Sequence, residues 1–506
     1  MPRRLAALAC ALTLAAGAAA HAARPAPATL GFLHVGSVAG APRLLDEAGR
    51  TVTLRGVNAN GLVDYWRSDL RPPLPTDAGS YRSGCPADDG STAAVPLCEQ
   101  DLAQMRALGF DNLRLPVSWS LLEPTPGHLD GRYVDRIAQV VRWARAQGIW
   151  VVIDLHQDAW SKYDYTPAGQ PCPPGTGTVK DQDGAPLWAS QHHLPVCAVA
   201  STRELDPAVV EDAQTFWLDL PAADGVGLQD HYAAVVAALA KRFADEPAVA
   251  GYDLMNEPEP GALPVAVGAA ELMPFYAKVV AAVRAAVPGF RQLVMLEPGV
   301  ERNTTAARYY ALPWSAYSDY PNAVYAPHVY TDVFTAGAVT GLPEVATFDS
   351  DYQAAVDDAA ALGLPLWVGE FGGSPSTDAT VLASHYAQQE ARGISGTVWV
   401  WKEHGSWSIA APSRATLVSR AYPVATAGTL LSAVSNPQAG TADFRATSTR
   451  VRPGDRARAM LVRLPLPFNG SRLTVTGARY EVQVSAGGRD VWVYPTGGAY
   501  QVRVSR

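Results

Sequence analysis

Residues 251–261 read GYDLMNEPEPG, and this stretch decides how we interpret the fold. An apolar run ends abruptly in Asn-Glu and is stopped by Pro258. Because proline disfavours helical geometry in the residue before it, we expect Glu257 to be extended at the end of a buried strand, with its carboxyl group directed out of the sheet. Residues 365–373, PLWVGEFGG, repeat the pattern around Glu370. Two acids at strand ends, far apart in the sequence, predict paired carboxylates across a cleft.

Outward from this stretch, strand-like runs alternate with helix-like segments. The strand-like runs are residues 52–58, 111–119, 148–156, 248–257, 291–299, 322–330, 365–370 and 396–403. Helix-like segments lie between them, for example at residues 99–108, 131–147, 228–243, 271–287 and 380–392. Such alternation predicts a parallel sheet with helices outside, and eight repeats favour a closed (β/α)8 TIM barrel over an open doubly wound sheet. None of these runs is followed by a GxGxxG fingerprint, which disfavours a dinucleotide-binding fold.

The end of the chain has a different pattern. From residue 422 onward, short alternating runs such as YEVQVSA and DVWVYPT are separated by glycine, proline and asparagine turns. They predict a small antiparallel β-sandwich. At 506 residues the chain exceeds the usual size of one domain. We therefore expect a (β/α)8 catalytic domain at residues 28–421 and a β-sandwich domain at residues 422–506.

The first 23 residues, MPRRLAALACALTLAAGAAAHAA, place two arginines before an alanine-rich apolar run and end in small residues typical of a cleavage site. We interpret residues 1–23 as a secretory signal peptide. The alternative is a membrane anchor, but the apolar run is shorter than the roughly 20 residues that a spanning helix needs. The expectation is a secreted or periplasmic protein.

Cysteine usage agrees with export. Without Cys10, which lies in the signal peptide, an even set remains: Cys85, Cys98, Cys172 and Cys197. Four cysteines allow three pairings, and we favour the two shorter loops, Cys85 with Cys98 and Cys172 with Cys197.

Two histidines and the net charge bear on possible partners. His192 and His193 lie close to Cys197, which raises the alternative of a metal site. Their spacing fits no zinc template, so we expect structural disulfides and neither a metal nor a cofactor. The formal charge of -8 includes no basic patch, which argues against nucleic acid as a partner.

In a (β/α)8 barrel, the C-terminal ends of all the strands meet on one face, and that face holds the active site. The polar and aromatic residues at the predicted strand ends are Asn58, Arg114, His156, Gln157, Asp158, Asn256, Glu257, Glu297, His328, Tyr330, Glu370, Trp399 and Trp401. A single one of them is better explained as a satisfied rim residue or a helix cap. Together they predict a site.

Two long connections carry many aromatic residues. They span residues 59–98 and 159–227, and loops of that length in a compact domain usually carry function. Their aromatic residues either pack the loops or offer flat surfaces to sugar rings and lipid chains: Trp66, Trp160, Tyr163, Tyr165, Trp188 and Trp217.

Paired carboxyl groups suit the cleavage of a glycosidic bond. The leaving oxygen needs a proton and the sugar carbon needs stabilisation, and in a retaining enzyme the two acids stand about 5 to 5.5 Å apart. The acid must be protonated while its partner is ionised, so their surroundings must differ. Arg114, His328 and Tyr330 are available to surround one carboxylate with donors.

Several segments together resemble glycoside hydrolase family 5. They are LRLPVSW, DLHQD, DLMNEP, PHVY, WVGEFGG and VWVWKE, and the resemblance covers residues 54–402. It implies two glutamates that act with retention, with Glu257 as acid/base and Glu370 as nucleophile. The remaining active-site positions that it implies are Arg114, His156, Asn256, His328, Tyr330 and Trp399.

Other segments resemble endoglycoceramidases and related glycolipid-cleaving members, which also carry a C-terminal β-sandwich. These segments are DLHQDAWSKY, GAPLWAS, DAQTFW, GLQDHYAAVVAALAKRF and GYDLMNEPEPG. The resemblance implies that Asp158 binds sugar hydroxyls. The sequence departs from that branch after its first strand, where RGVNANGLVDYWRSDL lacks the lysine associated with sugar recognition, so the sugar specificity stays open.

These observations predict a retaining β-glycosidase that cleaves a sugar from ceramide or another apolar aglycone. The alternatives are an endo-β-glucanase or mannanase acting on polysaccharide, and a non-catalytic carbohydrate-binding protein built on the same barrel. The expected partner is a carbohydrate or glycolipid substrate, with transient contact to a membrane or micelle surface. A monomer is the expected oligomeric state.

Overall fold

The computed structural model describes residues 30–63, 74–88, 90, 94–180, 182–199, 202–262, 265–331, 333, 346–373, 377–404, 407–485 and 487–506. The predicted signal peptide and Trp66 lie outside the described residues. None of the helices in the described ranges is long and apolar enough to cross a membrane.

Eight parallel strands form the central sheet. They are β4 (Arg55–Asn58), β5 (Asn112–Ser118), β6 (Trp150–His156), β9 (Val249–Asp253), β10 (Leu293–Leu296), β11 (Ala323–Tyr325), β12 (Trp367–Phe371) and β13 (Ser395–Val398). The sheet runs in the order β11-β10-β9-β6-β5-β4-β13-β12, and parallel bridges from Tyr325 to Leu366 and from Val329 to Phe371 close it. The predicted TIM barrel is confirmed, and each strand lies within the run predicted for it or overlaps it.

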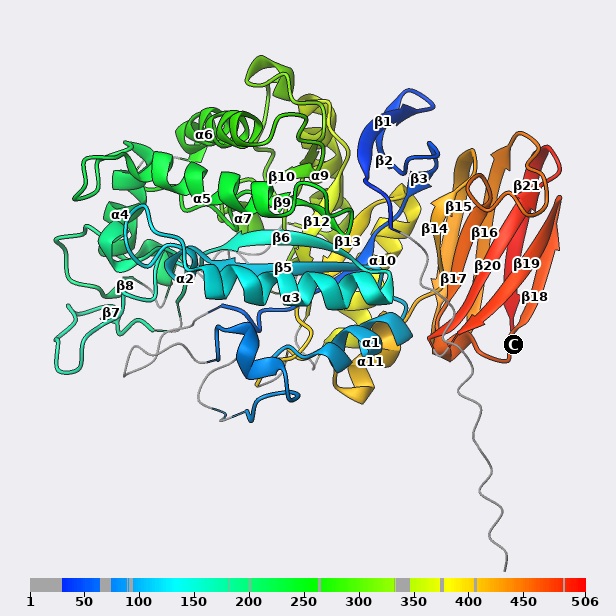
Figure 1. Cartoon of the computed structure of the whole chain (residues 1–506), viewed down its shortest axis with the longest axis horizontal. Helices are drawn as coiled ribbons and strands as arrows, with labels where there is room; N and C mark the ends of the chain where they lie inside the picture. Colours follow the sequence, from blue (N-terminus) through cyan, green and yellow to red (C-terminus); the bar gives the residue numbers. More distant parts are fainter. Residues whose placement is uncertain are drawn as a thin grey trace, which may run out of the picture.

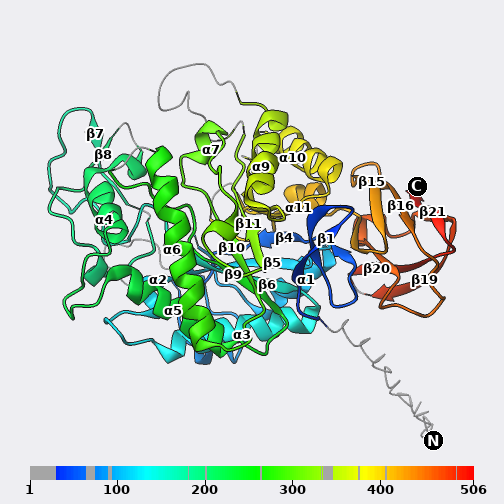
Figure 2. The ribbon, with the colours of Figure 1, turned by 90° about the horizontal axis from the view of Figure 1, so that it is seen from above.

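Helices surround this barrel (Figures 1 and 2). The main ones are α1 (Glu99–Ala107), α3 (Gly131–Gln147), α5 (Leu228–Arg242), α6 (Val265–Ala286), α9 (Phe348–Leu362) and α10 (Asp378–Arg392). Five of them match or overlap the helix-like segments given above as examples. Helix α9 was not among those examples, although Thr347 caps its start through Ser350 and Gly363 ends it with a positive φ. Helix α6 begins before the predicted residue 271 and contains Pro274 in its interior.

Two antiparallel sheets form the C-terminal part, as predicted. Their C-terminal strands are β14 (Tyr422–Thr426), β15 (Thr429–Asn436), β16 (Thr441–Ser448), β17 (Met460–Leu464), β18 (Arg472–Thr476), β19 (Ala478–Ser485), β20 (Gly488–Pro495) and β21 (Gly498–Ser505). Figure 1 shows these orange and red strands beside the barrel. They enclose an apolar core of their own, which includes Phe444, Val462 and Val502.

The N-terminal strands join the C-terminal part. They are β1 (His34–Val38), β2 (Ala41–Leu45) and β3 (Thr51–Val52). Strand β3 pairs with β14, so that one sheet has the order β1-β2-β3-β14-β17-β20-β19. The first and last segments of the chain therefore share hydrogen bonds, which local sequence patterns do not reveal.

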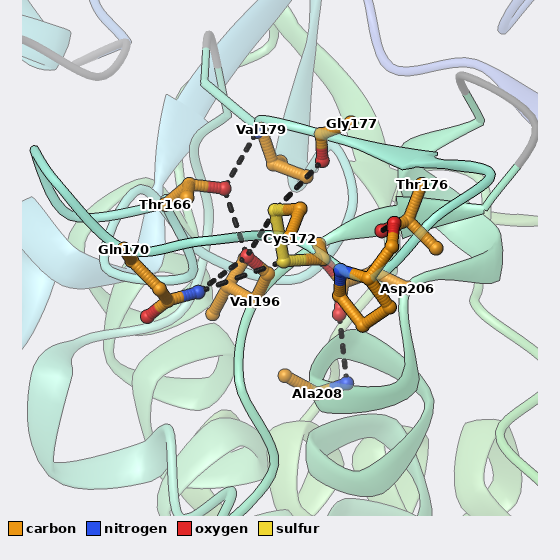
Figure 3. Close-up of a disulfide and its surroundings, with 11 residues drawn as sticks. Thr166, Gln170, Cys172, Thr176, Gly177, Val179, Val196, Asp206 and Ala208 are labelled. Atoms are coloured by element: carbon orange, nitrogen blue, oxygen red, sulfur yellow. Dashed lines mark hydrogen bonds between the residues drawn. A yellow bond between two sulfur atoms is a disulfide. The ribbon is translucent and has the colours of Figure 1, made fainter.

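Both predicted disulfides are present, Cys85 with Cys98 and Cys172 with Cys197. The second lies in the long connection between β6 and α5, next to α4 (Pro207–Trp217), as Figure 3 shows. Asp206 caps this helix by accepting a hydrogen bond from the amide of Ala208, at 2.8 Å. The connection is thus held by a covalent link and carries a helix of its own.

Candidate active site

Arg114 is the buried centre of the candidate site. It lies on β5 with no exposed surface, and its guanidinium group pairs with acids from four other strands or strand ends. The distances are 3.1 Å to Asp154, 2.9 Å to Asp253, 2.8 Å to Glu297 and 2.6 Å to Glu370. Four acids around one cation keep its pKa well above the ordinary value in spite of burial. Arg114 thereby fixes the orientation of these four carboxylates.

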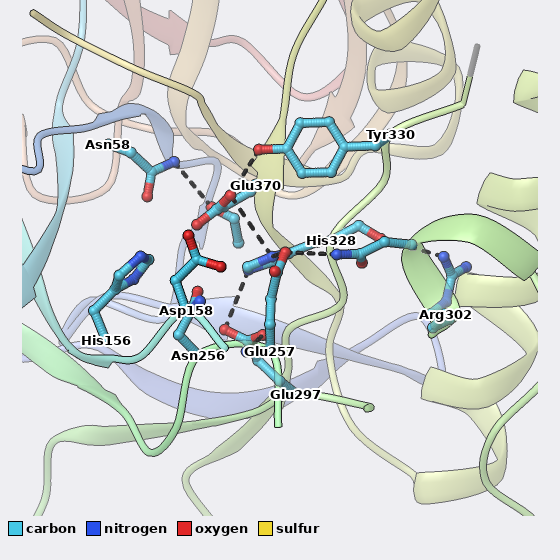
Figure 4. Close-up of polar contacts among 12 residues, drawn as sticks. Asn58, His156, Asp158, Asn256, Glu257, Glu297, Arg302, His328, Tyr330 and Glu370 are labelled. Atoms are coloured by element: carbon cyan, nitrogen blue, oxygen red, sulfur yellow. Dashed lines mark hydrogen bonds and ion pairs between the residues drawn. The ribbon is translucent and has the colours of Figure 1, made fainter. Parts of the chain in front are cut away.

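Glu370 ends β12 and receives two strong donors. Arg114 Nη1 lies 2.6 Å from its Oε1, and the hydroxyl group of Tyr330 donates to its Oε2 at 2.6 Å (Figure 4). Only 6% of its side chain is exposed. Both oxygens are therefore held in place, as a nucleophile requires.

Glu257 follows β9 in a left-handed conformation, with a φ of +40°. The prediction that it is extended is wrong. Pro258 disfavours the right-handed helical region for the residue before it, but Glu257 adopts the left-handed region instead of an extended conformation. Its amide donates to Glu297 Oε2 at 2.8 Å, and the side-chain amide of Gln157 donates to its carbonyl group at 2.7 Å. A positive φ in a non-glycine residue costs on the order of 1–3 kcal/mol, and such strain is typical of functional sites.

Two donors hold the carboxylate of Glu257. His328 Nδ1 lies 2.7 Å from its Oε1, and the Asn303 amide donates to the same oxygen at 2.5 Å. The three donors predicted to surround one carboxylate are therefore divided. Arg114 and Tyr330 contact Glu370, whereas His328 is closer to Glu257 than to Glu370, from which it lies 3.7 Å.

The two acids are close neighbours. A carboxylate oxygen of Glu257, one of Glu370 and a ring nitrogen of His328 all lie within 4.8 Å of one another. Burial lowers the pKa of His328, but Glu297, Glu370 and Glu257 outweigh it and raise the pKa well above its usual value. His328 is therefore a cation placed between the two acids.

The pKa values of the two acids are displaced in opposite directions. Burial raises the pKa of Glu370, and the nearby charge of Glu257 adds to this against the lowering effect of His328 and Arg114. Burial also opposes ionisation of Glu257, but hydrogen bonds from His328 and Asn303 prevail and lower its pKa. Without substrate, a proton shared by the pair therefore favours Glu370.

The other predicted residues line the same end of the barrel. His156 stacks on the partly exposed Trp399 with a ring-centre distance of 5.8 Å and an angle of 11°. Asp154 and Asp183 overcome the effect of burial and raise the pKa of His156 to about 10. Asp158 pairs with Arg203 at 2.7 Å.

Asn256, one of the active-site positions that the resemblance implied, is almost completely enclosed. Its amide oxygen accepts from Arg114 Nη2 at 2.8 Å, and its amide nitrogen donates to the carbonyl group of Gln157 at 2.8 Å. Only 2% of the residue is exposed.

Sequence reasoning missed Asn303 and the two aspartates that pair with Arg114. Asn303 lies on the short helix α7 (Arg302–Thr305), six residues after Glu297, and no strand-end pattern points to it. Asp154 and Asp253 each stand within an apolar strand, at DLH and DLM. A carboxylate inside an apolar run indicates a buried cation nearby, and this pattern would have pointed to both aspartates.

Three of the loop tryptophans pack the structure. Trp160, Trp188 and Trp217 contact the rings of Trp119, His231 and Phe216 or Phe275, and the indole N–H groups of Trp188 and Trp217 donate to backbone carbonyl groups. Tyr163 and Tyr165 are partly exposed.

Comparison with known proteins gives consistent matches. The family model described as Cellulase (glycosyl hydrolase family 5) matches residues 89–405, more than half of the chain. Endoglycoceramidase I of Rhodococcus hoagii (strain 103S) is 28% identical over 409 residues, which cover 76% of this chain and 72% of that protein.

Solved structures agree. A crystal structure of endogalactoceramidase is 30% identical, with a TM-score of 0.76 over 94% of this chain and 100% of that one. A structure of endo-glycoceramidase II from Rhodococcus sp. as a lactosyl-enzyme intermediate is 25% identical, with a TM-score of 0.70 over 92% of this chain and 99% of that one.

Proposed function

The chain belongs to glycosyl hydrolase family 5 and is an O-glycosyl hydrolase, and from this premise we propose that it is a retaining β-glycosidase acting on glycolipids. In this proposal Glu370 is the nucleophile and Glu257 is the acid/base. The observation that carries it is the separation of the two carboxylates, with one oxygen of each within 4.8 Å. That spacing is closer to the roughly 5 to 5.5 Å of retaining enzymes than to the roughly 6.5 to 9.5 Å that inverting enzymes need to place a water molecule.

The first step joins the sugar to Glu370. Its carboxylate attacks the anomeric carbon while Glu257 donates a proton to the leaving oxygen, and the carbon–oxygen bond to the aglycone breaks. Positive charge that develops at the sugar favours ionised Glu370, which moves the shared proton toward Glu257. His328 and Asn303 then stabilise the carboxylate that Glu257 becomes.

The second step releases the sugar. Glu257, now ionised, takes a proton from water, and the water oxygen attacks the anomeric carbon and displaces Glu370. Tyr330 and Arg114 stay on the two oxygens of Glu370 and stabilise its departure as a carboxylate. A lactosyl-enzyme intermediate of endo-glycoceramidase II, a protein 25% identical to this chain, supports this course.

Two observations support an apolar aglycone. The relatives include an endoglycoceramidase and an endogalactoceramidase. In addition, large apolar side chains are exposed in the connection between β6 and α5, at Leu187, Leu194, Val199, Leu205, Leu218, Leu220 and Val226. Exposed apolar surface of this kind suits transient contact with a membrane or micelle that holds the substrate. The two disulfides support export, with residues 1–23 as the signal peptide.

Chemical rescue tests the nucleophile. Glu370→Gly removes the attacking oxygen, so we expect a loss of at least about 1,000-fold in kcat on an activated aryl β-glycoside. Sodium azide should restore turnover and yield a glycosyl azide of inverted configuration. Glu246→Gln is the matched control, because Glu246 pairs with Arg145 before β9, at the other end of the strand. Full activity of Glu370→Gly without azide would refute the assignment.

A substrate panel tests the aglycone. Lactosylceramide and glucosylceramide in micelles, compared with soluble β-glucan and mannan, should show hydrolysis of the ceramide glycosides with kcat/KM higher by at least about tenfold. Equal or better hydrolysis of polysaccharide would favour the glucanase or mannanase alternative while leaving the roles of Glu257 and Glu370 intact.

A further inference from the structure

Asp164, His192 and Asp212 meet in the connection between β6 and α5, outside the candidate active site. His192 Nδ1 lies 2.6 Å from Asp212 Oδ2 and 3.6 Å from Asp164 Oδ1. One potential ligand atom from each residue lies within 4.8 Å of the other two. The three residues are far apart along the connection, so the fold brings them together.

Asp164 is buried beside a second acid. Its side chain is 0% exposed, no N–H group of the described residues donates to its carboxylate oxygens, and the side chains that interact with it include Asp212 and Ser190. An ionised carboxylate in this state is costly unless it is paired or coordinates a cation. Burial, reinforced by Asp212, accordingly raises the pKa of Asp164 well above its usual value. Two buried acids side by side are costly to ionise together unless a cation lies between them.

The charge around Asp164 is unbalanced. In the described residues, the ion pairs of Asp164 and Asp212 are made by His192 alone. Asp206, which caps α4, adds a third negative group nearby. Two other clusters of acids with a histidine lie in the candidate active site, at Asp253 with Glu297 and at Glu257 with Glu370. Arg114 already supplies positive charge there.

We propose that Asp164, His192 and Asp212 bind a divalent transition-metal cation, with Zn²⁺ as the best fit. Two carboxylate oxygens and one imidazole nitrogen are a donor set that Zn²⁺ accepts at about 2.0–2.2 Å, whereas Ca²⁺ prefers oxygen ligands alone. Small side-chain shifts would bring the three atoms to that distance. His192 is 21% exposed, which leaves a path for entry and a place for a water molecule as fourth ligand.

The cation would cross-link the connection at three points. Asp164 lies shortly after β6, His192 lies near the middle of the connection, and Asp212 lies on α4. The Cys172–Cys197 disulfide closes a loop in the same segment. Arg203, which pairs with Asp158 at the barrel mouth, belongs to this segment as well. Metal binding therefore stabilises the wall beside the site and does not enter the hydrolytic chemistry.

Binding of ZnCl₂ to the full-length, untagged protein tests the proposal. After treatment with EDTA and its removal, calorimetric titration should show one Zn²⁺ bound per chain, and thermal unfolding should shift upward with added Zn²⁺. Asp164→Asn and His192→Gln should each weaken binding by at least about 100-fold, the upper end of the loss seen when a group that only supports a ligand is removed.

Two control variants locate the metal. His193→Gln changes the adjacent histidine, which is 88% exposed and pairs with Glu211 on α4, so the zinc affinity of this variant should equal that of the wild type. Glu257→Gln should also keep it, because the active site is not the binding site. Thermal unfolding without metal checks that each variant is folded. If Asp164→Asn does not fold, the result for His192→Gln, at a partly exposed position, decides the test.

Three results would overturn the proposal. They are no stoichiometric Zn²⁺ binding by the wild type, wild-type affinity in both Asp164→Asn and His192→Gln, and loss of binding in Glu257→Gln or His193→Gln. Each readout is independent of hydrolysis, so failure of the glycolipid proposal would leave this test unaffected.

Discussion

His328 Nδ1 lies 2.7 Å from Oε1 of Glu257, although the two residues are 71 positions apart. The other ring nitrogen of His328 lies 3.1 Å from Glu297, so acids hold both sides of the imidazole. A cation beside Glu257 makes it a stronger acid in the first step and stabilises the carboxylate that acts as base in the second. The same contact explains why the pKa of Glu257 is lowered rather than raised in the free protein.

Glu257→Gln should reveal the acid/base role through the leaving group. Loss of general acid catalysis costs about 10²–10⁴-fold, and the loss should be largest for ceramide, a poor leaving group. A dinitrophenyl glycoside needs little proton donation, so its first step should be nearly unchanged. The measurement is kcat/KM on both substrates; equal losses on both would contradict the assignment.

Tyr330→Phe should move the basic limb of the pH–rate profile upward. The Tyr330 hydroxyl group donates to Glu370 Oε2 and favours its charged form. Its removal raises the pKa of Glu370 further above that of Glu257, so the second proton of the pair leaves at a higher pH. Ionised Glu370 becomes scarcer, and kcat/KM should fall by about 10- to 100-fold. Tyr320→Phe is the control, since Tyr320 bonds the carbonyl group of Gln292 instead. An unchanged basic limb would argue against Glu370 as the ionised partner.

Asn303→Ala should move the acid limb of the pH–rate profile upward, because Glu257, with its lowered pKa, is the first of the two acids to lose its proton. The Asn303 amide favours the carboxylate form of Glu257. Without it the pKa of Glu257 rises, and Glu257 stays protonated to a higher pH. We expect a modest fall in kcat/KM of about tenfold at the optimum. Steady-state rates across the pH range measure this, and a downward shift would contradict the assigned proton donor.

Asp111→Asn should stabilise the protein at neutral and alkaline pH. Burial raises the pKa of Asp111 to about 7, although its Oδ1 accepts from the Arg55 amide. The native state therefore holds a proton that the unfolded chain releases near pH 4, so the free energy of unfolding falls as pH rises from about 4 to 7. The full effect is about 4 kcal/mol. Urea unfolding at pH 5 and pH 8 should show the part of this loss that falls above pH 5, about 3 kcal/mol, in the wild type and not in Asp111→Asn.

Removal of residues 422–506 should prevent the barrel from folding as a soluble protein. The cut removes β14 from β3 and exposes the edge of the N-terminal strands. It also breaks the pair of Arg106 with Asp490 and the bond of Tyr422 to the Gly109 carbonyl group. Exposed edges promote aggregation. Soluble expression and circular dichroism measure the outcome, and a soluble, active barrel would support domains independent of each other.

The sequence by itself determined the architecture and the two acids of the candidate site. The strands and most helices could be predicted from local sequence, because the spacing of apolar residues along a segment shows which of its faces is buried. Glu257 and Glu370 could be found because a parallel barrel brings all strand ends to one face, whatever the details of packing. The four cysteines left three pairings open, and the structure agrees with the preferred one, in which both loops are short.

Only the tertiary structure decided how charges are shared within that face. It placed Arg114 among four acids, gave His328 and Asn303 to Glu257, and gave Tyr330 to Glu370. It also turned Glu257 to a positive φ, against the local preference. These contacts join residues from different strands and loops. Barrel closure and burial set their distances, and no local pattern carries that information.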